Sequence, residues 1–346
     1  MKKDYLEKTR AHLETLQDLL QDAAQFLIVM QDNPDPDSIA AALALRELVH
    51  HLGDVSCSIT HGGSVGRAEN RALVKYLDLN LRNLKELDWR RFDRIAMVDT
   101  QPGTGNNSLP KEVIPDIVID HHPLRRASRQ VLLHDIRSHY GATATILLEY
   151  LTQAKITPTT PLATAIMYAI RSDTQDLGMQ ASAADIQAIQ VLYPLANKRM
   201  LSEIQRGSVH RDYFTMLTTA LTQARIYKHC IITSLDEITN CDMISEVADL
   251  LLRDEEVSWT LCYGFCREKM WLSLRTSESG KHADQVMKRL VARRGAGGGH
   301  ETMAGGQIPL KKKTKAERNH LEKVIREKFL KLLGISGNHG KKLISS

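Results

Sequence analysis

The sequence predicts an α/β protein whose N-terminal domain contains a doubly wound, mostly parallel sheet. Two observations lead to this fold class. Short apolar runs alternate with helical segments over the first half of the chain, which is typical of parallel strands joined by helices. From about residue 228, longer strand-like segments and a glycine-rich stretch dominate. We therefore expect a smaller α/β domain at the C-terminal end, facing the first domain across a cleft.

A helix and a buried strand are the first elements expected. Leucines recur at helical spacing between residues 5 and 24, and residues 26–30 form a continuous apolar run. The run ends before Pro34 and Pro36, which fit neither a central strand nor a helix interior. Ser38 is expected to cap the helix that follows, and Gly53 to close it.

The alternation continues to about residue 195. Strands are expected at residues 55–60, 94–99 and 116–120, and helices at residues 142–154 and 184–195. Helices on both faces of the resulting sheet are expected. The segment that follows is polar, with a helical pattern. The expected parts of the chain are a first domain at 1–197, a helical connector at 198–225, a second domain at 226–335 and a polar tail at 336–346.

Composition excludes several classes of protein. The 346 residues are 42% hydrophobic and 25% charged, as in average soluble proteins, so collagen-like and disordered chains are excluded. Apolar runs are too short to span a membrane, and the N-terminal segment lacks the apolar stretch of a signal peptide. The five cysteines are scattered and odd in number, which favours free thiols in the cytoplasm. Cys262 and Cys266 are expected in a buried strand rather than in a zinc site.

Positive charge is concentrated at the C-terminal end. The net charge is +5, while residues 311–346 contain 11 basic and 3 acidic side chains. Such a segment could guide polyanions toward a site. It is also compatible with an ordinary amphipathic surface helix, which is the interpretation we favour.

Acidic residues follow the predicted strands of the first domain. The carboxyl ends of parallel strands meet at one edge of a sheet, where ligand sites gather. Each residue alone is explained by a helix cap or a turn, but capping does not require a carboxylate at every strand end. The residues that we expect to converge are Asp35, Asp37, Asp99, Asp120, His121, His122 and Asp173.

Carboxylates packed together resist ionisation unless positive charge is supplied. Four aspartate charges balance two divalent cations, and oxygen ligands with an imidazole suit Mn²⁺ or Mg²⁺ better than structural zinc. We expect Mn²⁺, with Mg²⁺ as the alternative. Two such cations support the hydrolysis of a phosphoester or a phosphoanhydride.

The ordered motifs NPDPDSIAAA, VDTQP, DHHP and SDT resemble those of the DHH phosphoesterase family. The later RGAGGGHETMAGG looks like the glycine-rich motif of the DHH-associated C-terminal domain. The resemblance extends over residues 25–310. It is strongest to the branch of nanoRNases and 3′-phosphoadenosine 5′-phosphate phosphatases, which is related to RecJ-like exonucleases.

The resemblance implies a role for each residue of the first domain. Asp35 would bind the first metal, Asp37 the second, and Asp99 both. The second metal would be completed by His121 and Asp173, while His122 would face the substrate phosphate and Asp120 would orient the histidine. One position departs from the branch: the first motif usually begins with histidine, and this chain has Gln31 there. Its amide oxygen is a weaker ligand, so the first metal should bind less tightly.

The second domain offers contacts for phosphate. Gly297, Gly298 and Gly299 would let backbone N–H groups approach an anion closely, and His300 adds a donor. Arg275 resembles the strand-borne arginine of the family and would clamp a phosphate in a fork. A surface ion pair explains Arg275 equally well.

The expected function is therefore a two-metal phosphodiesterase or phosphatase that hydrolyses short oligonucleotides to mononucleotides, and also 3′-phosphoadenosine 5′-phosphate. Two alternatives stay open: a phosphodiesterase of linear or cyclic dinucleotides, and a non-catalytic nucleotide or single-strand binding protein with a weakened first metal site. The expected partners are short single-stranded nucleic acid or a small phosphorylated nucleotide, with no membrane. A homodimer is left open.

Overall fold

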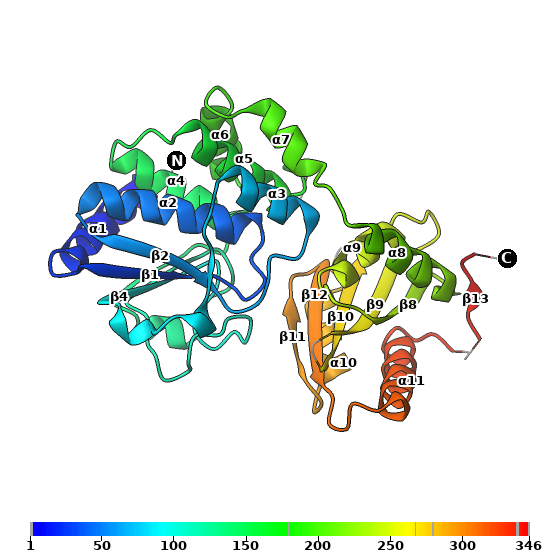
Figure 1. Ribbon diagram of the computed structural model, residues 1–346. Coiled ribbons are helices and arrows are strands. Elements are labelled where there is room, and N and C mark those ends of the chain that lie inside the picture. The colour runs from blue at the N-terminus through cyan, green and yellow to red at the C-terminus, as the bar shows by residue number, and fades with distance from the viewer. Residues whose placement is uncertain (1–2, 179, 267, 279, 337–338, 345–346) are drawn as a thin grey trace. The chain divides into compact units, whose positions relative to one another are not determined.

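The computed structural model describes residues 3–178, 180–266, 268–278, 280–336 and 339–344. It divides into two compact units, Met1–Ser208 and Val209–Ser346. Figure 1 shows a sheet with its own helices in each unit. Each unit encloses hydrophobic cores of its own, so each is described by itself.

The first unit contains a six-stranded sheet in which all neighbouring strands are parallel. The strand order is β3-β2-β1-β4-β5-β6, so the direction of winding reverses between β1 and β4. Ligands of open α/β sheets bind beyond the carboxyl ends of the strands at such a reversal. The expected parallel α/β fold is therefore confirmed. The strands are β1 (Gln25–Val29), β2 (Ser56–His61), β3 (Arg82–Asn83), β4 (Arg94–Val98), β5 (Ile117–Asp120) and β6 (Leu133–Ile136).

The long helices of this unit cover one face of the sheet (Figure 1). They pack on alternate residues of β1, Phe26 and Ile28, whereas Leu27 and Val29 face the opposite side. The helices are α1 (Lys3–Leu20), α2 (Pro36–Leu52), α3 (Ala68–Tyr76), α4 (Thr143–Gln153), α5 (Thr160–Asp173), α6 (Ala183–Leu192) and α7 (Lys198–Gln205).

The second face of the sheet differs from our expectation of helices on both sides. It is covered by loops and by short 3₁₀ helices, η1 (Leu84–Glu86), η2 (Trp89–Arg91) and η3 (Ala127–Gln130). The connection from β4 to β5 begins DTQPGTGNN, and its proline and glycines disfavour a helix. Leu109 and Val131 from these connections complete the small core on this side.

Helix α2 begins earlier than we expected. Its N-cap is Asp35 rather than Ser38, because the Asp35 carboxylate accepts a hydrogen bond from the Ser38 backbone N–H at 2.9 Å. Pro36 takes the first helical position, where its missing N–H costs nothing. Asp37 therefore lies in the first turn, and both acidic side chains are fixed at the start of the helix.

The second unit contains a seven-stranded mixed sheet, and among its described residues only β8 and β9 pair in parallel. The glycine-rich stretch is itself a hairpin of β11 and β12, at one end of the order β11-β12-β10-β9-β8-β7-β13. The strands are β7 (Arg225–Tyr227), β8 (Cys230–Glu237), β9 (Trp259–Cys266), β10 (Lys269–Thr276), β11 (Ala296–Gly299), β12 (Met303–Pro309) and β13 (Lys341–Lys342).

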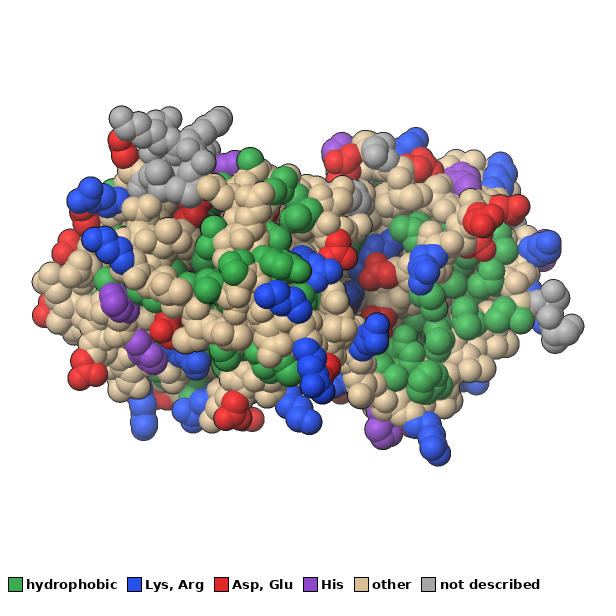
Figure 2. Space-filling model, turned by 90° about the horizontal axis from the view of Figure 1, so that it is seen from above, with side chains coloured by type: hydrophobic (Ala, Val, Ile, Leu, Met, Phe, Trp, Pro, Cys, Tyr) green, Lys and Arg blue, Asp and Glu red, His purple; other side chains and the backbone are tan. Residues whose placement is uncertain are grey.

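Two helices cover each face of this sheet. α8 (Arg211–Gln223) and α9 (Met243–Leu251) share one core with it, and α10 (Ala283–Val291) and α11 (Lys315–Leu332) share the other. In α11 a stripe that includes Leu321, Ile325 and Phe329 is buried. The basic segment therefore contains an amphipathic helix that belongs to the fold, while residues 337–338 and 345–346 of the expected tail lie outside the described residues. On the face drawn in Figure 2, basic and acidic side chains are interspersed.

The cysteines correct one expectation. Cys262 and Cys266 are buried in β9 as predicted, but Cys266 forms a disulfide with Cys241 and is not a free thiol. The two are 25 residues apart in sequence, and the pairing of Ile238 N–H with the Phe265 carbonyl brings their segments together. A spacing of this kind carries no signal in a sequence with an odd cysteine count. Among the described residues, every helix is too short or too polar to cross a bilayer.

Candidate metal centre

Acidic and imidazole side chains meet at the carboxyl edge of the six-stranded sheet. Asp99 directly follows β4, and Asp120 ends the neighbouring parallel strand β5, with His121 and His122 next in the chain. Asp173 reaches the same place from the last turn of α5, so its expected position at a strand end is wrong. The convergence itself follows from parallel pairing, since every strand brings its carboxyl end to one edge.

Asp37 is held by the first turn of α4. Its two carboxylate oxygens accept hydrogen bonds from the backbone N–H groups of Thr143, at 2.7 Å, and Ala144, at 2.9 Å. The start of a helix favours negative charge because its first N–H groups have no partner within the helix. The buried Asp37 carboxylate therefore satisfies α4 while it remains beside the other acids.

Asp99 and His121 form the centre of the cluster. The Nε2 atom of His121 lies 3.6 Å from Asp99 Oδ1 and 3.6 Å from Asp173 Oδ2. The Thr143 hydroxyl donates to Asp99 Oδ1 at 3.1 Å. The Asp99 backbone has φ of 57°, a left-handed conformation that costs free energy for any residue but glycine.

Among the described residues, two groups of three side chains could hold a cation. In each group, one nitrogen or oxygen atom from every residue lies within 4.8 Å of the others. Carboxylate oxygens with one or two imidazoles suit a divalent cation such as Mn²⁺. The groups are Asp99, His121 and His122, and Asp37, His121 and Asp173.

Ionising all the carboxyl groups of the cluster is unfavourable when no cation is bound. Burial and the Asp35 charge raise the pKa of Asp37 to about 7. The pKa values of Asp99 and Asp173 are also raised well above their usual range, by loss of solvent and by the neighbouring aspartates. A cation would remove this penalty, so the donor atoms and the electrostatics both fit divalent metal.

The pKa values of the two histidines are shifted in opposite directions. Burial lowers the pKa of His121, so its imidazole is neutral at pH 7, the form that binds metals. Burial also acts against the charged form of His122, but the Asp120 carboxylate, 2.8 Å from its Nδ1, raises the pKa of His122. The His122 side chain is 36% exposed, which leaves it accessible to a ligand.

Gln31 donates hydrogen bonds to the cluster. Its amide nitrogen donates to Asp35 Oδ2 at 2.6 Å and lies 3.5 Å from Asp99 Oδ2. The NH₂ group therefore partly compensates the carboxylates at the position where the related branch has histidine. Binding a cation through the amide oxygen requires the amide to turn by about half a rotation, which breaks both contacts.

Sequence reasoning missed two residues of this site. Thr143 contacts both Asp37 and Asp99, and Gln101 is fully buried behind Asp120. The Gln101 amide nitrogen donates to Asp120 Oδ2 at 2.7 Å, and its oxygen accepts from Arg125 N–H and from the Ser128 hydroxyl, both at 2.8 Å. Gln101 lies two residues after Asp99 at a strand end, which was a usable signal. The start of α4 at Thr143 offered none.

Arg275 and the glycine stretch belong to the second unit. Arg275 is buried in β10, where it pairs with Asp249 and donates to the Ser273 hydroxyl at 2.8 Å, so the ion-pair interpretation describes its contacts. His300 follows Gly299 at the end of β11, and its N–H donates to the Met303 carbonyl. Their part in substrate binding stays a prediction.

The three glycines occupy different environments. A Cβ atom on Gly297 would lie 2.9 Å from Met287 of α10. Gly299 has φ of 150°, and a Cβ atom there would collide with the Met303 carbonyl oxygen. Both are therefore required by the fold. A Cβ atom on Gly298 would meet nothing within 4 Å.

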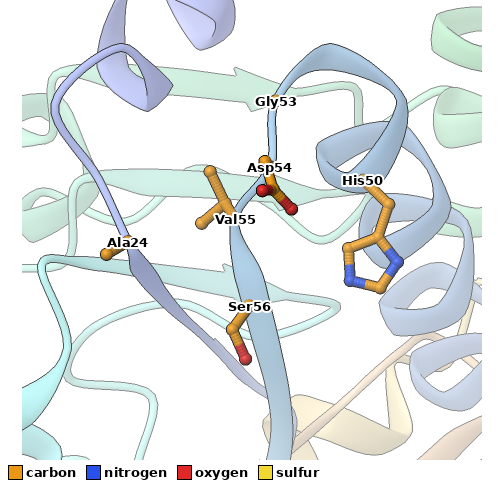
Figure 3. Close-up of a pocket in the computed structure, with 6 residues that line it drawn as sticks. All are labelled: Ala24, His50, Gly53, Asp54, Val55 and Ser56. Atoms are coloured by element: carbon orange, nitrogen blue, oxygen red, sulfur yellow. The ribbon is translucent and has the colours of Figure 1, made fainter.

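A cavity of about 360 Å³ lies at the opposite edge of the sheet, before β2 begins (Figure 3). Its wall includes His50 and Asp54, but these do not belong to either group of candidate ligands. This cavity is therefore separate from the acidic cluster at the carboxyl edge.

One known protein is similar to this chain over most of its length. An uncharacterized protein of Methanocaldococcus jannaschii is 33% identical over 319 residues, which cover 90% of this chain and 65% of that protein. This chain therefore spans just under two thirds of the length of that relative.

Two solved structures are also similar. An exopolyphosphatase-related protein from Bacteroides fragilis superposes with a TM-score of 0.71 at 15% identity, over 94% of this chain and 98% of that one, and shares the fold. RecJ from Thermus thermophilus, solved with Mg²⁺, gives a TM-score of 0.45 at 14% identity, over 92% of this chain and 52% of that one.

Two family descriptions match the chain directly. The DHH family N-terminal domain matches residues 25–170, which contain every acidic and imidazole residue of the cluster except Asp173. The DHHA1 domain matches residues 227–327, which contain Arg275 and the glycine hairpin. The chain belongs to the DHH family, with a DHH domain in its first unit and a DHHA1 domain in its second.

Proposed function

We propose that this protein is a divalent-cation-dependent phosphoesterase that hydrolyses short oligonucleotides to mononucleotides, and also 3′-phosphoadenosine 5′-phosphate. The observation that carries the proposal is the convergence of Asp37, Asp99 and Asp173 with His121. The raised pKa values of these carboxyl groups support a cation site over a set of helix caps.

Divalent cations bound by these residues would lower the pKa of a water molecule and polarise the phosphoryl oxygens. The protein side chains supply orientation and a proton. His121, neutral and fixed, offers Nε2 as a ligand, and Asp99 and Asp173 offer carboxylate oxygens. His122 has Nδ1 bound to Asp120, so in its charged form Nε2 can donate a proton to the leaving oxygen.

The turn after the DHHP motif supports a polyanionic substrate. Arg125, Arg126 and Arg129 are exposed there, and Gln101 ties the backbone of the turn to Asp120. Positive charge on this turn would attract phosphate groups that the carboxylates alone would repel. This arrangement favours substrates with more than one phosphate over neutral esters.

The experiment compares substrates with and without Mn²⁺. Purified protein is incubated with a labelled dinucleotide, a long single strand, 3′-phosphoadenosine 5′-phosphate, a cyclic dinucleotide, pyrophosphate and short polyphosphate. We expect the dinucleotide to be hydrolysed first, with EDTA abolishing turnover. Preferential hydrolysis of the long strand, of the cyclic dinucleotide or of the phosphoanhydrides would contradict the proposed substrate class. Polyphosphate is included because the Bacteroides fragilis protein is described as exopolyphosphatase-related.

A binding protein without catalysis is the second candidate, and Gln31 motivates it. The Gln31 amide already occupies an Asp35 oxygen, so the first cation could bind too weakly for turnover. Such a protein would retain oligonucleotide without hydrolysing it, and Asp99→Asn would leave retention unchanged. Gln31→His should then create turnover. For the proposed hydrolase, the wild type already turns over and Asp54→Asn, at the opposite edge of the sheet, serves as the matched control.

A further inference from the structure

We propose that Tyr140 is a positioning residue for His121, and that a buried ionic network reaching from α1 to α4 holds Tyr140 in place. The proposal rests on the proposed function only in treating His121 as a cation ligand. Its tests measure the imidazole and the bound cation, not turnover, so it can fail while the proposed function stands.

The link to His121 is a single backbone contact. The Nδ1 atom of His121 lies 3.1 Å from the Tyr140 carbonyl oxygen, which can only accept a hydrogen bond. Nδ1 must therefore carry the proton in the neutral ring. The lone pair is then on Nε2, the atom that lies 3.6 Å from Asp99 and from Asp173. A bond to the other ring nitrogen is the usual device that orients a metal-binding histidine.

Tyr140 is itself fixed at both its ends. Its backbone N–H donates to the Arg137 carbonyl at 2.9 Å. Its hydroxyl donates to Glu149 Oε1 at 2.9 Å and accepts from Arg137 Nη1 at 3.2 Å. These contacts restrain the residue whose carbonyl receives His121.

Arg137 is the centre of the network and is 1% exposed. Every guanidinium nitrogen has partners: Nε and Nη2 bond Asp135, Nη1 bonds Glu149 and Tyr140, and Nη2 also bonds Thr9. A buried charge network in which the donors are satisfied is rigid, whereas one that loses a partner is costly.

Helix α1 closes the network, although it precedes the segment that matches the DHH family. Thr9 accepts from Arg137 Nη2 at 2.7 Å, and Lys8 Nζ lies 3.3 Å from Asp135 Oδ1. Residues far apart in sequence are thus joined to the cluster through Tyr140. The N-terminal helix therefore acts on the candidate metal centre as well as on the core.

The first test uses NMR of cation-free protein with labelled histidine, at a pH above the histidine range. Wild-type His121 should show only the form protonated at Nδ1, with slow exchange of that proton. In Tyr140→Phe the carbonyl remains but the hydroxyl contacts of the residue are lost, so we expect faster exchange of the Nδ1 proton and a population protonated at Nε2. His121 signals identical to those of the wild type would overturn the proposal.

The matched control is Tyr150→Phe. The Tyr150 hydroxyl donates to Asp135 Oδ2 at 3.0 Å and contacts His12, so its loss weakens the same network without touching Tyr140. Both variants should lower the midpoint of thermal unfolding to a similar extent. Tyr140→Phe should change the His121 signals much more than Tyr150→Phe, which leaves both hydroxyl contacts of Tyr140 in place. Equal changes in both variants would show that the network is merely structural.

The second test measures Mn²⁺ affinity by calorimetry. Removing the support of a ligating histidine typically weakens metal binding about tenfold or more. We expect that loss in Tyr140→Phe and an affinity within about twofold of the wild type in Tyr150→Phe. If Tyr140→Phe binds Mn²⁺ as the wild type does, the positioning role is wrong. If the wild type binds Mn²⁺ but hydrolyses no substrate, the proposed function fails and this inference stands.

Discussion

At the scale of single residues, the candidate metal centre contains features that lower the stability of the folded protein. Asp99 adopts a left-handed backbone, and its buried carboxyl group lies beside other acids. Neither feature benefits the fold by itself. Sites where local preferences are violated in this way are often functional.

Asp99→Gly should separate these two effects. Glycine adopts the left-handed conformation freely, and the substitution removes a buried charge, so the free energy of unfolding in EDTA should rise by about 1 kcal/mol. Turnover should be lost, because a ligand is missing. Urea unfolding and the dinucleotide assay measure the two outcomes. An Asp99→Gly protein that still hydrolyses substrate would remove Asp99 from the site.

Asp37 should make stability depend on pH. Its pKa is about 7 in the folded protein, whereas an exposed aspartate titrates near pH 4. The folded state therefore binds a proton that the unfolded chain releases, and stability falls as the pH rises from about 4 to 7. We expect the midpoint of thermal unfolding in EDTA to decrease over this window.

Saturating Mn²⁺ should remove that decrease, since the cation replaces the proton. Asp37→Asn in EDTA should show a shallower dependence than the wild type. If stability in EDTA rises between these pH values and Mn²⁺ changes nothing, the acidic cluster does not behave as a cation site.

At the scale of elements, the glycine hairpin contains both structural and unexplained positions. Gly297→Ala would force a Cβ atom to within 2.9 Å of Met287, which should cost about 1–3 kcal/mol of stability. Gly298→Ala has open space and should leave stability unchanged. If the hairpin binds phosphate, Gly298→Ala should raise KM severalfold all the same. An unchanged KM would leave Gly298 without a role in binding.

The turn after the DHHP motif, which contains three exposed arginines, allows a second test at this scale. Replacing Arg125, Arg126 and Arg129 by glutamine should raise KM for a dinucleotide and flatten its dependence on salt, with kcat nearly unchanged. Arg90→Gln with Arg91→Gln, on the 3₁₀ helix η2, is a control with exposed arginines away from the cluster. Equal effects in both variants would indicate general attraction by surface charge rather than a substrate contact.

The elements also show how far the sequence can be interpreted. Apolar runs predicted β1, β4 and β5 to within about one residue, because a buried parallel strand needs continuous apolar side chains. Asp173 was expected at a strand end and lies on α5, since a short apolar run fits a buried helix equally well. The Asp35 cap displaced the Ser38 cap because both residue types serve that position.

Contacts between distant residues were not predictable. The bond from Arg137 to Thr9 joins residues 128 positions apart, and nothing in either local segment indicates it. The disulfide between Cys241 and Cys266 is similar, because the pairing of two segments decides it. The order of the acidic motifs was enough for the cluster, since one rule of sheet geometry brings strand ends together.

At the scale of the whole molecule, two units with separate cores should unfold separately. Calorimetry should therefore resolve two transitions. Mn²⁺ should raise the midpoint temperature of the first unit's transition only, because the candidate ligands all belong to that unit. A ligand stabilises the state that binds it. A reducing agent should lower only the other, which contains the disulfide. A single transition that responds to both additions would show that the units are strongly coupled.

The position of α1 has a practical consequence for recombinant work. A fragment cut at the start of the family match would begin at residue 25, and it would leave Arg137 without Thr9 and expose one side of the ion network to water. We expect such a fragment to precipitate or to express poorly. A lack of turnover by this fragment would then reflect misfolding and would not test the proposed activity. Recombinant versions of this protein should therefore keep its first twenty residues.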